Sequence, residues 1–297
     1  MEYLKALEAE AIYIFRETIA QFTNPVILFS GGKDSTILLH LAKKAFSPAK
    51  VPFKVLHIDT GHNFPEVLEF RDNLARREGL ELTVRKVEDT IREKRIEEPR
   101  EKLPSRNGLQ SITLTDAIKE LEIDACIGGG RRDEEKARAK ERIFSFRNED
   151  GKWQPYNQRP ELWDIYNGRI KPGQNVRVFP ISNWTELDVW NYIKEEQIEL
   201  PALYYAHERE CLVYKDKLIA TSEYVRAEEN DEIVTASVRY RTVGDMTCTA
   251  AVRSAAKNIE EVIAEIAASK TSERGETRMD DRFSDAAMED RKLNGYF

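Results

Sequence analysis

The chain has 297 residues, enough for one large domain or for one domain with a small appendage, since domains usually hold about 100 to 200 residues. Hydrophobic residues make up 41% of the chain and charged residues 33%, a balance typical of globular rather than disordered proteins. The net charge of -7 excludes a global basic field, so we expect neither nucleic acid nor a membrane as a partner.

Two further features bear on where the protein works. No stretch comes near the roughly 20 apolar residues that a membrane span needs, and the first residues are too charged for a signal peptide. Cys126, Cys211 and Cys248 are odd in number and widely spaced, which fits neither a disulfide framework nor a CxxC pair. We therefore expect a cytoplasmic protein.

The first residues of the chain predict a helix and then a buried strand. Apolar side chains recur at helical spacing between Leu4 and Phe22. The short apolar run over residues 26–29 predicts a strand that is buried on both faces. A second helix should follow at once, with Ser35 or Thr36 as its N-cap.

Three more strands are expected farther along. The runs 53–58, 80–87 and 125–127 have the length and apolar character of strands. A helix should start at Pro65 and end at Gly79, and another should cover residues 115–121. Four strands that alternate with helices predict an α/β fold with a doubly wound parallel sheet.

The second half of the chain is less regular. Residues 146–176 lack a period but are rich in aromatic residues, so we expect a long ordered excursion. A helix is predicted over residues 185–195, a strand over 237–241 and a helix near 259–266. We expect a main domain over residues 1–215 and, over 216–297, a C-terminal α+β appendage with a charged tail.

The strongest chemical signal is a seven-residue turn between a predicted strand and a predicted helix: Ser30, Gly31, Gly32, Lys33, Asp34, Ser35 and Thr36. Its glycines let backbone N–H groups approach an anion, and the helix N-terminus adds partial positive charge. Lys33 and the serine hydroxyls add further donors. The pattern predicts a phosphate-binding loop; an ordinary glycine turn with a serine cap is the alternative.

A GxxxxGK[ST] phosphate loop is absent from the sequence. We therefore do not expect a GTPase or an ordinary kinase.

Polar residues also follow two other predicted strands. Asp59 and Thr60 come after the second strand, at the sheet edge where ligands bind, and could contact adenine or ribose; Asp59 could instead cap the next helix. Arg131 and Arg132 follow three glycines after the fourth strand, and their guanidinium groups match phosphate or sulfate oxygens. The charged run from Lys136 to Arg142 fits anion binding and a solvated helix face equally well.

The Ser30 loop resembles the pyrophosphate-binding loop of the ATP pyrophosphatase families, which cleave ATP between its α and β phosphates. The whole chain resembles one family closely, the small catalytic subunits of bacterial heteromeric sulfate adenylyltransferases, relatives of the phosphoadenylylsulfate reductases. The likeness rests on residues 129–136, 157–163, 177–190, 241–244, 271–274 and 295–297, besides the Ser30 loop. The segments containing Arg131 and Trp184 are the most selective.

This resemblance implies a fold of the adenine nucleotide alpha hydrolase type, with residues 1–215 as the nucleotide-binding domain. It implies the reaction of ATP with sulfate to give adenylyl sulfate and pyrophosphate, the first step of sulfate assimilation. Mg²⁺ would accompany ATP, and no tightly bound organic cofactor is expected. The implied partner is a GTPase large subunit, in a heterodimer or higher assembly, whose GTP hydrolysis drives the unfavourable forward step.

The resemblance also implies roles for individual residues. Catalytic roles fall to Lys33, Arg131 and Arg132. ATP contacts fall to Ser30, Gly31, Gly32, Asp34, Ser35, Asp59 and Thr60. Sulfate or lid contacts fall to Arg241, Arg253 and Arg274, within a tail from Thr271 to Arg278 that folds over the occupied site. Asp34 is also the candidate ligand for Mg²⁺, although it could simply cap its helix.

The aromatic excursion between Trp153 and Trp163 and the C-terminal appendage are the expected docking surfaces for the partner.

Three alternatives stay open from the sequence. A reductase of adenylylsulfate or phosphoadenylylsulfate would share the nucleotide site but needs a reactive thiol on the C-terminal tail, and no cysteine follows Cys248. A tRNA-thiolating enzyme needs a sulfur-carrying cysteine and a basic surface, which the acidic balance disfavours. A non-catalytic nucleotide sensor could use the same loop to bind ATP.

Overall fold

The computed structural model describes residues 2–98, 101–135 and 138–269, together with residues 271, 273, 277 and 279. The elements up to the fourth strand are α1 (Glu2–Gln21), β1 (Pro25–Leu28), α2 (Lys33–Phe46), β2 (Lys54–Asp59), α3 (Pro65–Glu78), β3 (Leu82–Lys86), α4 (Val87–Lys94), α5 (Asn107–Glu120) and β4 (Ala125–Ile127). The later elements are β5 (Phe144–Arg147), β6 (Asn175–Val178), α6 (Glu186–Glu195), β7 (His207–Tyr214), β8 (Lys217–Ala220), β9 (Ile233–Arg239), β10 (Ala250–Arg253) and α7 (Ile259–Ala268).

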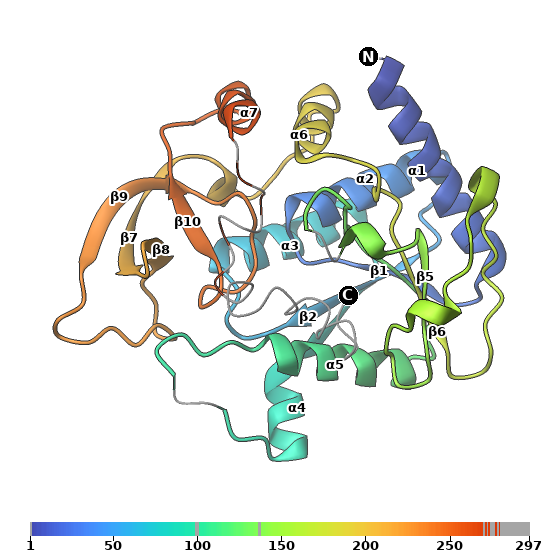
Figure 1. The fold of residues 1–297 in the computed structure, drawn as a ribbon, viewed down its shortest axis with the longest axis horizontal. Coiled ribbons are helices and arrows are strands. Elements are labelled where there is room, and N and C mark those ends of the chain that lie inside the picture. The colour runs from blue at the N-terminus through green and yellow to red at the C-terminus, as the bar shows by residue number, and fades with distance from the viewer. Residues whose placement is uncertain are drawn as a thin grey trace.

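The main sheet has the strand order β3-β2-β1-β4-β6-β5 (Figure 1). Its strands pair in parallel from β3 to β6, and β5 pairs antiparallel with β6 at one edge. In Figure 1, α5 lies below the strands, and α2 and α3 lie above them. The predicted α/β class with a doubly wound, mainly parallel sheet is confirmed.

Alternate residues of β1 pack on opposite faces of the sheet. Ile27 packs with residues of α1 and α2, whereas Val26 and Leu28 pack with residues of α4 and α5. This is the period of two that a strand imposes, and it explains why a fully apolar run forms here: both faces are covered.

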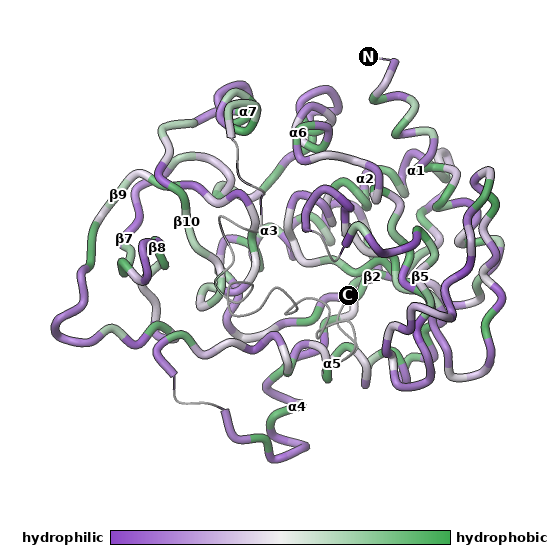
Figure 2. The backbone as a smooth tube through the Cα atoms, in the orientation of Figure 1, coloured by the Kyte–Doolittle hydropathy of each residue, from purple (hydrophilic) through white to green (hydrophobic). Residues whose placement is uncertain are grey.

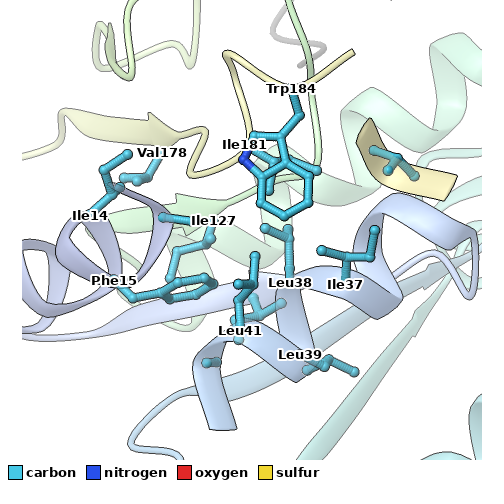
Figure 3. Packing of buried hydrophobic residues seen from close by; sticks show 14 of the residues in the cluster. Ile14, Phe15, Ile37, Leu38, Leu39, Leu41, Ile127, Val178, Ile181 and Trp184 are labelled. Carbon is cyan, nitrogen blue, oxygen red and sulfur yellow. The ribbon is translucent and has the colours of Figure 1, made fainter. Parts of the chain in front are cut away.

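The core above the sheet joins the first two helices to the strands (Figure 3). Phe15 of α1 and Leu38 of α2 lie close to Ile127 of β4, and Trp184 is fully buried over them. The outer helices are amphipathic, and Figure 2 shows hydrophilic and hydrophobic residues alternating along α6 and α7. Among the helices that the structure describes, none is long and apolar enough to cross a membrane.

A second, antiparallel unit follows the main sheet. Strands β7 to β10 close into a small barrel, on the left in Figure 1. Its core includes Phe64 and Val67, which lie just past the carboxyl end of β2, so the barrel packs beside the ligand-binding edge of the main sheet. The barrel begins at His207, and residue 215 lies in the turn between β7 and β8. The domain boundary at residue 215 stays a prediction.

Several local predictions differ from the structure. α2 begins at Lys33 with Gly32 as its N-cap, so the prediction that Ser35 or Thr36 caps it is wrong. Both hydroxyls lie in the first turn and donate to the carbonyl of Gly32 over 2.9 Å. The expected excursion is ordered, and it connects the two strands β5 and β6, which the sequence did not indicate.

Candidate functional site

A cavity of about 190 Å³ lies at the carboxyl edge of the main sheet. Its wall is formed by the ends of β1 and β2, the start of α2, one face of α5, the glycines after β4, and residues 242–245. Glu273 from the C-terminal segment completes the wall. This is the edge at which open parallel sheets bind ligands.

The Ser30 loop forms one side of this cavity. Gly31 has φ of 78°, and a Cβ there would stand 2.5 Å from Cγ1 of Val67, so glycine is required at this position. The backbone N–H of Lys33 donates to the hydroxyl of Tyr204 over 2.8 Å, which fixes the first turn of α2. Ser30 and Ser35 pair through their hydroxyls over 3.2 Å. The loop is thus held in a shape that presents a helix N-terminus to the cavity.

Four charged side chains meet behind this loop. The ammonium of Lys33 contacts Oδ2 of Asp34 over 3.2 Å and also contacts Glu273. Nε of Arg131 donates to Oδ1 of Asp34 over 2.9 Å, and Nη2 of Arg131 donates to Glu273. Lys33 and Arg131 are each 1% exposed, and Glu273 is 4% exposed. The cluster is therefore a network of two cations and two carboxylates, of which only Asp34 is partly exposed.

Burial and ion pairing shift the pKa values of the groups in this network in opposite directions. Burial raises the pKa of Glu273 to about 7, although Lys33 and Arg131 both favour its ionised form. Burial lowers the pKa of Lys33, but Asp34 and Glu273 outweigh that effect and hold the pKa above its ordinary value. The same two carboxylates raise the pKa of Arg131 against its burial. Both cations therefore stay charged.

The segment after β4 lies directly against the Ser30 loop. A Cβ on Gly129 would stand 2.8 Å from Cβ of Asp34, and Gly130 also lines the cavity. The two segments that the sequence analysis singled out separately are thus in contact. Neither of the two arginines that follow lines the cavity. Arg131 is buried behind the Ser30 loop and reaches Asp34, whereas Arg132 is directed to Asn183.

The other expected contact residues are scattered. Arg241 is buried and pairs with Glu186, and its backbone oxygen accepts from Lys33 over 3.2 Å. Arg253 is exposed on β10. Arg274 lies outside the described residues, as do Lys136 and Arg278.

Asp59 and Thr60 lie beside the cavity without lining it. Asp59 accepts from the backbone N–H of Gly61 over 2.9 Å, and it does not cap α3, whose N-cap is Phe64. Thr60 is buried and donates to Oδ1 of Asp245 over 2.5 Å. Thr60 therefore helps to place the 242–245 segment in the cavity wall.

Arg138 of the charged run from Lys136 to Arg142 lines the cavity. Sequence reasoning missed several other residues of the wall: Asn107, Gln110, Tyr204, Asp245 and Glu273. Glu273 lies within the 271–274 run that resembles the family pattern, but the resemblance implied a role in that run for its neighbour Arg274. Nothing local in the sequence indicates that Tyr204 reaches the Ser30 loop, because the contact joins residues 171 positions apart.

The carboxylates of the cavity are the candidate ligands for the expected Mg²⁺. The structure describes no cluster of three acidic, histidine or cysteine side chains that could hold a metal. The side chain of Asp34 is 26% exposed and lines the cavity. Because Mg²⁺ commonly takes one or two carboxylates together with substrate phosphates, these residues fit an ion that arrives with a nucleotide.

Comparisons with known proteins agree on one family. The phosphoadenosine phosphosulfate reductase domain family matches residues 24–251. The sulfate adenylyltransferase subunit 2 of Mycolicibacterium gilvum (strain PYR-GCK) is 56% identical over 297 residues, which cover 100% of this chain and 95% of the relative. The protein of the same name from Mycobacterium tuberculosis (strain ATCC 25177 / H37Ra) is 53% identical, with the same coverage.

A solved structure is also similar. The phosphoadenylyl-sulfate reductase from Candida auris, in its phosphate complex, aligns with a TM-score of 0.45 at 17% identity. The alignment covers 68% of this chain and 90% of that chain.

Proposed function

We propose that this chain, which belongs to the phosphoadenosine phosphosulfate reductase domain family and within it to the sulfate adenylyltransferase subunit 2 proteins, joins ATP and sulfate into adenylyl sulfate and pyrophosphate. The chain is an enzyme of the nucleotidyltransferase class.

One observation carries the proposal. A single cavity combines the Ser30 loop, whose helix N-terminus suits an anion, and the charged Lys33 with aliphatic walls from Leu28, Ile58 and Leu114. A nucleoside triphosphate needs both environments, one for its phosphates and one for its base. Arg131, directly behind the loop, adds a second fixed cation.

The reaction asks for alignment and charge neutralisation. A sulfate oxygen forms a bond to the α phosphorus, the bond from that phosphorus to the bridging oxygen breaks, and pyrophosphate leaves with the electron pair. The amides of the Ser30 loop and Lys33 would hold the leaving pyrophosphate, while Arg131 would offset the repulsion between sulfate and the α phosphate. Asp34 would hold Mg²⁺, whose charge neutralises that of the phosphates.

The second arginine is a weaker candidate on geometric grounds. Arg132 is directed to Asn183, so its side chain would have to turn toward the cavity to meet sulfate. Arg241 is held by Glu186 and would act through the backbone contact to Lys33.

A separate energy source is part of the proposal. The phosphosulfate anhydride is a high-energy product, and this sequence has no GxxxxGK[ST] loop for GTP. The relatives are named as subunit 2, which implies another subunit. We assign to that subunit the GTP hydrolysis that drives the formation of adenylyl sulfate. The reaction would take place in the cytoplasm, as the first step of sulfate assimilation.

The excursion before β6 is the proposed contact for this partner. Trp163 is 85% exposed and Tyr156 is 95% exposed. Polar residues of the same loop face inward instead: Glu161 accepts from the backbone of Phe144 over 2.7 Å and Gln158 from that of Phe146 over 3.0 Å. Polar groups thus cover the edge strand β5 while aromatic groups are turned to solvent, an arrangement that suits an interface.

The deciding experiment measures sulfate-dependent pyrophosphate release from ATP. The purified chain is assayed alone and with its cognate partner subunit and GTP, and omission of sulfate is the control. Release that requires sulfate supports the proposal. Bound ATP without release under all conditions would instead indicate a nucleotide sensor. The reductase alternative needs an accessible thiol, and all three cysteines are buried.

A further inference from the structure

One helix of the cavity wall carries side chains that the phosphate chemistry does not use. Asn107, Gln110 and Leu114 of α5 all line the cavity. They are three and four positions apart, the spacing that places side chains on one face of a helix. A single face of α5 therefore looks onto the space beside the Ser30 loop.

The surroundings of this face are aliphatic. Leu28 and Leu56 line the same cavity, and both belong with Leu114 to one buried apolar cluster. No charged residue of α5 lines the cavity. Flat apolar walls with one or two amides are the usual environment of a purine base rather than of phosphates.

Gln110 is the amide that is available to a ligand. Asn107 is 7% exposed and engaged in further interactions. The side chain of Gln110 is half-buried, and it makes no hydrogen bond to any residue that the structure describes. Its amide can therefore turn to a base without breaking an existing contact.

An amide side chain can distinguish adenine from guanine by its hydrogen bonds. A glutamine side chain offers one donor and one acceptor, which match N7 and the N6 amino group of adenine. Guanine presents two acceptors, N7 and O6, on the same edge, so the amide oxygen would face another oxygen. We propose that Gln110 is the residue that selects adenine over guanine in this cavity.

This inference rests on the proposed function and deepens it. If GTP drives the partner subunit, the ATP cavity of this chain has to reject GTP in a mixture of both. Recognition of the base by α5 would distinguish ATP from GTP. Residues that contact only the phosphates could not, because the two nucleotides carry the same triphosphate.

The test compares ATP and GTP binding to the full chain, with Mg²⁺ and without sulfate. Gln110→Leu removes the amide, and Gln110→Glu keeps the shape and the acceptor but loses the donor. We expect each variant to reduce the ratio of ATP to GTP affinity at least fivefold, mainly by weakening ATP binding. Gln174→Leu is the matched control, because Gln174 is half-buried and lies outside the cavity.

An unchanged affinity ratio in both variants, with melting temperatures near that of the wild type, would overturn the role of Gln110. Sulfate-dependent pyrophosphate release from the same preparations would then leave the proposed function intact. A wild-type chain that binds neither nucleotide would overturn the proposed function and this inference together.

Discussion

The carboxylate of Glu273 lies against the ammonium of Lys33, in the wall of the cavity that faces the Ser30 loop. The negative carboxylate of Glu273 thus pairs with the ammonium group that the phosphates of a nucleotide would contact. It is buried and also accepts from Arg131. A nucleotide that binds through Lys33 and Arg131 must therefore compete with Glu273.

Glu273→Gln should bind ATP at least threefold more tightly than the wild type. The amide keeps the shape of the side chain but removes the charge that competes with phosphate. Equilibrium binding of ATP to the purified chain measures the effect. Glu265→Gln is the control, since Glu265 pairs with Arg239 and lies outside the cavity. Weaker binding by Glu273→Gln would show that Glu273 assists the nucleotide.

The advantage of this variant should depend on pH. Burial raises the pKa of Glu273 to about 7 from an ordinary 4.5, with Asp34 and Glu186 raising it further and Lys33 and Arg131 lowering it. The side chain is thus ionised above pH 7 and becomes neutral below it. We expect the affinity difference between Glu273→Gln and the wild type to be largest near pH 8 and to shrink toward pH 6. A difference that is constant over this range would contradict the assignment.

Arg131→Lys should lower kcat/KM for pyrophosphate release by 100-fold or more, about 2.7 kcal/mol of transition-state stabilisation. Lysine keeps a charge for Asp34 and Glu273 but loses the planar fork that matches phosphate and sulfate oxygens. Arg131→Ala should also destabilise the fold, because Asp34 and the buried Glu273 would then share the single positive charge of Lys33.

The same substitution at Arg132 tests whether the two arginines contribute differently to catalysis. Arg132 is directed to Asn183, away from the cavity wall, so Arg132→Lys should cost less than Arg131→Lys. Equal losses would show that Arg132 turns toward the substrate.

Gly129→Ala should weaken ATP binding at least tenfold. The Cβ of the new alanine would stand 2.8 Å from Cβ of Asp34 and 3.2 Å from the carbonyl carbon of Asp34. The Ser30 loop and the segment after β4 would therefore have to move apart. Gly108→Ala is the control, because nothing lies within 4 Å of the added atom and Gly108 is in α5. That change should stabilise the chain by up to about 1 kcal/mol. Binding of ATP and the melting temperature are measured for both, and equal ATP affinity would contradict the contact.

Trp163→Ala combined with Leu162→Ser should weaken binding to the partner subunit at least tenfold. Both side chains are exposed, so neither is needed to pack the chain's own core. Titration of the two purified subunits measures the affinity. Tyr3→Ser is the control, because Tyr3 is an exposed aromatic residue on α1, outside both expected docking surfaces. Unchanged affinity would move the interface elsewhere, and loss of self-association would assign the surface to a second copy.

Local sequence signals predicted the elements that build the edge of the cavity. The helix from Pro65 to Gly79 is present, with proline at its start and Gly79 in the left-handed conformation at its end. The strand and helix on either side of the Ser30 loop are present because a buried apolar run, a glycine turn and an amphipathic pattern are all short-range features.

The parts that sequence did not predict depend on long-range contacts. Glu273 reaches Lys33 across 240 positions, and Tyr204 reaches the backbone of the same residue across 171. β5 is short and fully buried, and its antiparallel pairing with β6 has no local signature. The start of α2 at Lys33 rather than after Ser35 was missed because Gly32 itself serves as the N-cap.

The most direct test of the account is a crystal structure of the chain with a non-hydrolysable ATP analogue and Mg²⁺. We expect the triphosphate on the Ser30 loop in contact with Lys33, the carboxylate of Glu273 displaced, and the adenine beside Gln110. A nucleotide bound outside this cavity, or bound here with Glu273 still paired to Lys33, would contradict the account.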